Sequence, residues 1–151
     1  MIIHGSGTIE SFIDVSGLNA SLSSNVTVTA QIWVTHTWNG DLTIRLYGPD
    51  GSYITLSNQR GFLYDNVFNG TLFTDSASNS VSSYSFSNNI VASPLKPEQP
   101  FSNFIGKNTN GKWKLLISTT YDYYDRQLYG FILNIKGKTT KIKKSKNKYK
   151  K

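Results

Sequence analysis

The stretch THTWNGDLTIRLYGPDGSYITL, residues 35–56, decides the fold of this chain. Its first half places an apolar residue at every second position, which is the pattern of a half-buried strand. The Gly-Pro-Asp-Gly run at residues 48–51 then has the composition of a tight turn, and the alternation resumes after it. The stretch therefore predicts two strands joined as a β-hairpin. The apolar positions are Leu42, Ile44, Leu46, Ile54 and Leu56.

The same alternation predicts four further strands outside the hairpin. These are residues 7–15, 26–34, 112–118 and 128–136.

Residues 66–93 alternate less regularly, and three prolines follow them within seven positions. We expect an extended segment at 66–75, broken at Asn69-Gly70, and then a long ordered loop with one short strand. Because proline removes a backbone donor, neither a helix nor a central strand fits the segment that begins at Pro94. With seven or eight short strands and no helical period, the chain is predicted to be an all-β, jelly-roll-like antiparallel β-sandwich of about eight strands.

Length and composition restrict the class of protein. A chain of 151 residues suits one domain and can bury a substantial core. It has no cysteine, which excludes disulfides and thiolate metal sites. No apolar run is long enough to cross a bilayer, and residues 1–12 lack the charge and apolar core of a signal peptide. We therefore expect an intracellular or virion protein without a membrane span.

Charge divides the chain into a sandwich at residues 1–135 and a lysine-rich tail at 136–151. The whole chain carries +7, but nine of its sixteen basic residues lie in the tail, which leaves the rest at −2. The tail has no apolar face, so we expect it to be disordered alone. Lysines can neutralise phosphates, or they can meet an acidic protein surface. The predicted contact residues are Lys136, Lys138, Lys141, Lys143, Lys144, Lys146, Lys148, Lys150 and Lys151.

Several short motifs recur in order along the chain: His-Thr-x-x-Gly-Asp-Leu, a Pro-x-Gly turn before a Thr-Leu strand, Arg-Gly, and Phe-x-Gly followed by Gly-x-Trp-x-Leu. They are carried by His36, Thr37, Gly40, Asp41, Leu42, Pro49, Gly51, Thr55, Leu56, Arg60, Gly61, Phe104, Gly106, Gly111, Trp113 and Leu115. In this order they resemble the P domain, or Homo B domain, which is found beside subtilisin-like serine proteases of the proprotein convertase and kexin type. The resemblance covers roughly residues 7–135. It implies an eight-stranded jelly roll that acts in folding, stability or partner contact, without a catalytic residue of its own.

The residues themselves give few signs of catalysis, and we expect no enzyme activity and no cofactor. A catalytic triad needs a histidine held by a carboxylate beside a serine. Only His4 and His36 are present, and the resemblance makes His36 a structural residue at a strand end.

Two further sets of side chains are candidates for binding. Calcium prefers oxygen ligands from loops, although turn aspartates more often bond to the backbone. The weak calcium candidates are Asp41, Asp75, Asp122 and Asp125. Exposed tyrosines suit a contact surface for protein or sugar, although they could instead cover the end of the sandwich. The tyrosines in question are Tyr121, Tyr123, Tyr124 and Tyr129.

Three functions remain open on this basis. The first is a structural or binding module with protein partners in a larger assembly, which its basic tail anchors to neighbouring proteins or nucleic acid. A minor capsid or other virion protein of a large DNA virus is one concrete form, because abundant Lys, Asn, Ile and Tyr indicate an AT-rich genome. The alternatives are an accessory domain of a subtilisin-like serine protease and a carbohydrate-binding adhesion module.

Overall fold

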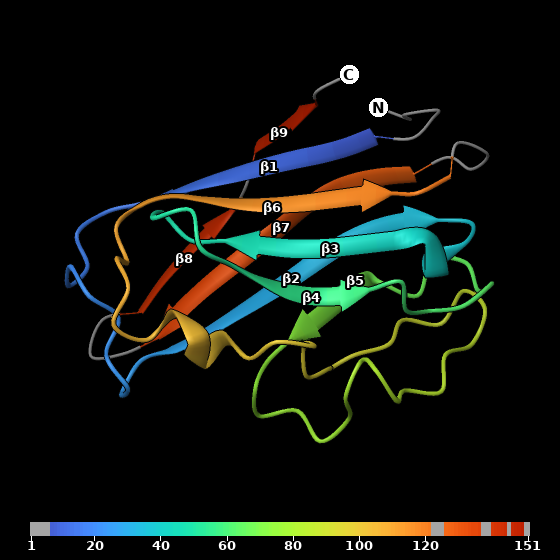
Figure 1. The fold of residues 1–151 in the computed structure, drawn as a ribbon, viewed down its shortest axis with the longest axis horizontal. Helices are drawn as coiled ribbons and strands as arrows, with labels where there is room; N and C mark the ends of the chain where they lie inside the picture. The colour runs from blue at the N-terminus through green and yellow to red at the C-terminus, as the bar shows by residue number, and fades with distance from the viewer. Residues whose placement is uncertain (1–6, 122–125, 137–139, 145, 150–151) are drawn as a thin grey trace.

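The computed structural model describes residues 7–121, 126–136, 140–144 and 146–149, the last two segments by their backbone alone. The chain forms two antiparallel sheets stacked face to face, as Figure 1 shows. One sheet has the strand order β4-β3-β6-β1-β9 and the other has the order β5-β2-β7-β8. The predicted all-β sandwich is therefore confirmed.

The strands are β1 (Gly7–Val15), β2 (Thr27–His36), β3 (Leu42–Tyr47), β4 (Tyr53–Asn58), β5 (Asn69–Phe73), β6 (Gly111–Thr119), β7 (Arg126–Lys136), β8 (Thr140–Lys144) and β9 (Lys146–Tyr149). Two single-turn 3-10 helices, η1 (Asn39–Asp41) and η2 (Phe101–Phe104), lie in the connections. Neither of these helices is long enough to cross a bilayer, and the described residues hold no other helix.

The hairpin predicted from residues 35–56 is β3 and β4. Its turn is closed by the amide of Gly48, which donates to the carbonyl of Ser52 at 2.8 Å. The Asp50 carboxylate accepts hydrogen bonds from both the amide and the hydroxyl of Ser52, and these bonds lower the pKa of the carboxyl. The local sequence thus closes this turn, and Lys107 adds an ion pair to Asp50 at 3.9 Å.

The core lies between the two sheets and is formed by the inward positions of the alternating strands. In β6, Trp113 is buried, packs edge-on against Phe104 at a ring distance of 5.0 Å, and donates its indole N–H to the carbonyl of Thr109. Both its apolar and its polar requirements are satisfied, as a buried tryptophan needs.

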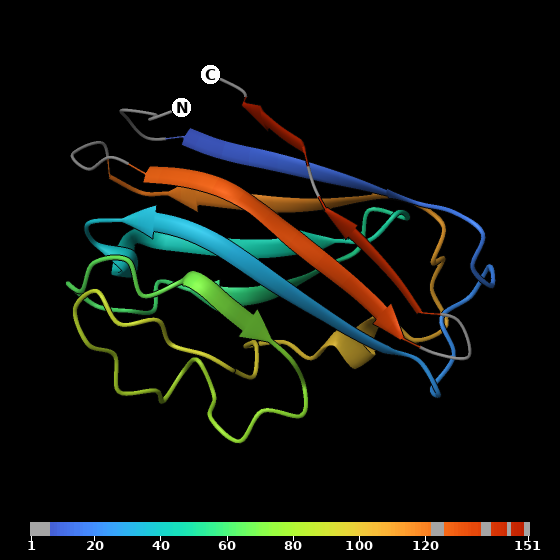
Figure 2. The ribbon, with the colours of Figure 1, turned by 180° about the vertical axis from the view of Figure 1, so that it is seen from behind.

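One flank of the sandwich is sealed by the long connection at residues 74–100. It lies along β4, where the amides of Glu98 and Gln99 donate to β4 carbonyls. It also lies along β5, where the amide of Leu95 donates to the carbonyl of Leu72 at 2.9 Å. Figures 1 and 2 show this connection in yellow-green beside the two strands.

The opposite flank is formed by β1 and β7, and the tail strands lie on it. β8 pairs with β7, and β9 pairs with β1. Because Ile9 pairs with Tyr149, the start of β1 and the end of β9 lie together (Figure 1).

Strand β5 begins at Asn69, and its pairing with β2 is interrupted at Gly70, so the expected break at Asn69-Gly70 is an irregularity within the strand. Three other expectations from the sequence are wrong in detail. Residues 76–93 hold no strand, because Ser80 makes only an isolated bridge to Lys96. Arg126 lies before the strand predicted at residues 128–136, yet it is the buried first residue of β7, because the pairing of β7 with β2 extends to His36. The tail, expected to be disordered, supplies two strands, because β1 and β7 each offer it a strand edge.

Candidate partner-binding surfaces

Three connections meet at one end of the sandwich, where β2 ends and β3 and β7 begin; we call it the apical end. They are residues 36–41, 59–66 and 119–121. The amide of Gly40 donates to the carbonyl of Phe62 at 2.7 Å, and the side chain of Gln59 donates to Thr120 at 3.3 Å. These bonds hold the three connections together as one surface.

His36 is at the centre of this end and is fully buried. Its Nδ1 accepts a hydrogen bond from the amide of Trp38 at 2.9 Å, so the ring nitrogen there carries no proton. Its carbonyl accepts bonds from Asn39 and Asn66, both at 2.9 Å. Burial lowers the pKa of His36, and the positive charge of Arg126 acts in the same direction. The residue has the structural role at a strand end that was expected for it.

Large apolar side chains are exposed at the apical end. Phe62 is 77% exposed, Leu63 54% and Trp38 40%; we call these three residues the apical patch. Phe62 has a φ of 51°, which is unusual for a bulky residue and costs free energy. Strain of this kind is found at functional sites, which is one reason to treat the patch as a contact surface.

The sequence did not identify the apical patch as a site. The signal was present in Phe62 and Leu63, two adjacent apolar residues that lie between the predicted hairpin and the extended segment expected at 66–75, outside any alternating strand. Trp38 was hidden because it lies between the motif residues His36 and Gly40.

The tyrosines singled out in the sequence are only partly described. Tyr121 is exposed and lies at the apical end, next to Thr120. Tyr129 is exposed on β7. Tyr123 and Tyr124 lie outside the described residues. A contact role for these tyrosines stays a prediction.

The acidic residues do not gather into a site within the described part of the chain. The carboxylate of Asp75 accepts bonds from the amides of Phe101 and Ser102, at 2.9 Å and 3.1 Å, and so holds the first turn of η2. Asp41 is buried at η1, which raises the pKa of its carboxyl. Asp122 and Asp125 lie outside the described residues. In the part described, no three His, Cys, Asp or Glu side chains are placed to hold a metal ion, so calcium binding stays a prediction.

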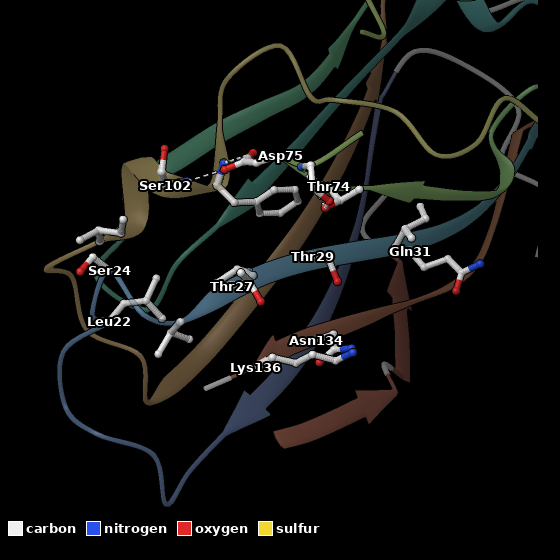
Figure 3. Close-up of a pocket in the computed structure, with 16 residues that line it drawn as sticks. Leu22, Ser24, Thr27, Thr29, Gln31, Thr74, Asp75, Ser102, Asn134 and Lys136 are labelled. Carbon is white, nitrogen blue, oxygen red and sulfur yellow. Dashed lines mark hydrogen bonds between the residues drawn. The ribbon is translucent and has the colours of Figure 1, made fainter. Parts of the chain in front are cut away.

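A groove of about 580 Å³ crosses the outer face of the β5-β2-β7-β8 sheet (Figure 3). Its floor is polar, and its wall is formed by η2 and the connection before β2. The labelled polar side chains include Thr27, Thr29, Gln31, Thr74, Asn134 and Lys136. The Oδ1 atom of Asn134 is buried without a hydrogen-bond partner among the described residues.

Hydroxyl and amide groups lie beside apolar side chains such as Leu22 and Phe101 along this groove. Among the described residues that line it, the one acid is Asp75, whose carboxylate already holds η2. The groove could not be predicted from the sequence, because outward threonines on a strand look like any solvent-facing positions.

The tail lysines can be placed only by the backbone. Lys136 is exposed at the end of β7 and lines the groove. Lys141, Lys143, Lys144, Lys146 and Lys148 lie in β8 and β9, whose side chains are not described, while Lys138, Lys150 and Lys151 lie outside the described residues. Their contact with nucleic acid or protein stays a prediction.

Comparison with known proteins gives two findings. A profile of the proprotein convertase P-domain matches residues 25–135, which is more than half of the chain. Among solved structures, the crystal structure of a serine protease of Aeromonas sobria is similar, with 14% identity and a TM-score of 0.35. The match covers 91% of this chain and 24% of that one, so this chain spans about a quarter of its length. Comparison with curated proteins gave no match.

Proposed function

This chain belongs to the proprotein convertase P-domain family, and from that premise we propose that it is a non-catalytic accessory module acting beside a subtilisin-like serine protease domain. The observation that carries the proposal is the family match over residues 25–135. A β-sandwich with a sealed core suits such a role, because it can support a neighbouring domain without taking part in its chemistry.

The apical patch is the surface that we assign to the protease. A contact between two domains needs apolar area at its centre, and Trp38, Phe62 and Leu63 supply it. The hydrogen bonds of His36 and Gly40 fix the loops that carry them, so little conformational entropy is lost on docking.

The family match favours this role over a place in a virion, which is the first of the three functions that the sequence leaves open. A virion role rests on residue composition alone. A sugar-binding role rests on tyrosines of which only Tyr121 and Tyr129 are described.

The proposal predicts that the immobilised full chain retains a serine protease from an extract of the source cells. Bound proteins are treated with a fluorophosphonate probe, which labels active serine hydrolases, and the labelled band is identified by mass spectrometry. We expect a subtilisin-like protease, with retention reduced about tenfold by Phe62→Ser because a central apolar anchor is lost.

Ile105→Ser is the matched control, because Ile105 is also exposed but follows η2, away from the apical end. It should retain the protease as the unchanged chain does. If no labelled protease is retained, the accessory role is wrong. If Phe62→Ser retains as much protease as the control, the role stands and the apical patch is the wrong surface.

A further inference from the structure

The two flanks of the sandwich are closed in different ways. The β4 and β5 flank is sealed by the connection at residues 74–100, through backbone bonds such as Leu95 to Leu72. The β1 and β7 flank has no such connection within the described residues, and only β8 and β9 lie along it. Without these two strands, β1 and β7 would be edge strands with unpaired backbone groups.

The tail closes this flank by crossing from one sheet to the other, as Figure 2 shows in red. β8 pairs with β7 from Ile132 opposite Lys144 to Lys136 opposite Thr140. β9 then pairs with β1 at residues 9–12. β8 also lies near β1, and β9 near β7, so the segment spans the gap between the sheets.

Buried apolar residues lie directly behind this flank. Leu133 and Ile135 of β7 are paired in register with β8, and Ile9 of β1 is paired with β9. All three are almost completely buried. An uncovered strand edge beside such an apolar row is a template for pairing with another chain.

The composition of the tail strands suits protection of an edge. Five of the nine residues in β8 and β9 are lysines, the residue with which natural sheets most often prevent pairing at an edge. The family match ends at residue 135, before either strand begins. These strands are therefore additional to the part of the chain that matches the family.

We propose that residues 140–144 and 146–149 form an edge strap. The strap supplies the missing partner for β1 and β7, and its lysines stop the flank from pairing with a strand of a second copy of this chain. This role is independent of the proposed protease partner. It also differs from the anchoring of nucleic acid that the sequence suggested, because here the tail acts on the sandwich of its own chain.

The test compares two double variants of the full chain, Ile142→Pro/Lys143→Pro and Ile142→Ala/Lys143→Ala. Amides along an antiparallel strand point alternately toward and away from the neighbour, so one of two adjacent residues must donate to β7. Proline removes that donor, whereas alanine keeps it and removes the same two side chains. The difference between the variants therefore reports backbone pairing.

Hydrogen exchange and light scattering provide the measurements. In the proline variant we expect amides of β7 at 132–136 to exchange about tenfold faster or more than in the alanine variant, and we expect the protein to self-associate. Amides of β3 and β6 should keep their protection in both variants, which shows that the sandwich remains folded. If both variants exchange like the unchanged chain and stay monomeric, the edge strap does not exist.

Discussion

At the scale of the residue, His36 shows how one side chain can hold the apical end together. Its ring accepts a bond from Trp38, and its carbonyl accepts bonds from Asn39 and Asn66. Protonation of the ring would place a charge in a buried site that already lies near Arg126, although Asp65 opposes part of this effect. The folded protein therefore favours the neutral ring.

This preference makes stability depend on pH. Burial lowers the pKa of His36 in the folded chain, whereas the unfolded chain keeps a pKa near 6.5. As the pH falls, the unfolded state therefore takes up the proton first. The stabilisation that is present above pH 6.5 is lost as the pH falls toward the lowered pKa of His36 in the folded chain. We expect the urea midpoint to fall between about pH 7.5 and about pH 5.5, and to fall less in His36→Asn. His4 is present in both proteins, so a difference between them reports on His36. Curves of the urea midpoint against pH that run parallel in the two proteins would contradict the prediction.

At the scale of the element, the loop at residues 59–66 depends on a close approach at Gly61. This glycine has a φ of 98°, and a Cβ there would lie 2.8 Å from the Cβ of Asn39. Gly51 in the hairpin turn has a similar φ of 85°, but a Cβ there would meet nothing within 4 Å. The two glycines share a conformational constraint and differ in the space around them.

Substitution of each glycine by alanine separates these two effects. Gly51→Ala should lower the free energy of unfolding by about 1 kcal/mol, the cost of a left-handed backbone. Gly61→Ala should lower the free energy of unfolding by about 1–3 kcal/mol more than Gly51→Ala does, because the added methyl forces η1 and the loop apart. Urea unfolding of the two variants measures the difference, and equal losses would show that the approach at Gly61 is not tight.

The elements also show what can be predicted from a sequence. Alternation predicted the strands that contain Trp113 and Leu46, because the inward residues of a half-buried strand are visible locally. It did not predict the burial of Arg126, which pairs with His36 far earlier in the chain, or the pairing of β9 with β1 at the opposite end of the sequence. Nor did it reveal the apical patch, since exposure depends on how three loops pack together.

At the scale of the whole molecule, the sandwich is built from pairs of strands that are distant in sequence. β1 pairs with β6, and β2 pairs with β7, each across about a hundred residues of chain. Such pairing requires the closure of long loops before any contact is gained, which slows folding. We expect refolding from urea, followed by the fluorescence of the three tryptophans, to take from milliseconds to seconds. Refolding within microseconds would contradict this view of the topology.

The pairing of Ile9 with Tyr149 has a consequence for how the module can be joined to other proteins. The backbone enters and leaves the sandwich at one corner, so the unit could be spliced into a surface loop of a host without distorting either partner. Gly7 pairs with Thr119 at that corner, and Thr119 also pairs with Leu42 at the start of β3. A host domain grafted there would lie at the end of the sandwich where β3 begins, which is also the end that carries the apical patch.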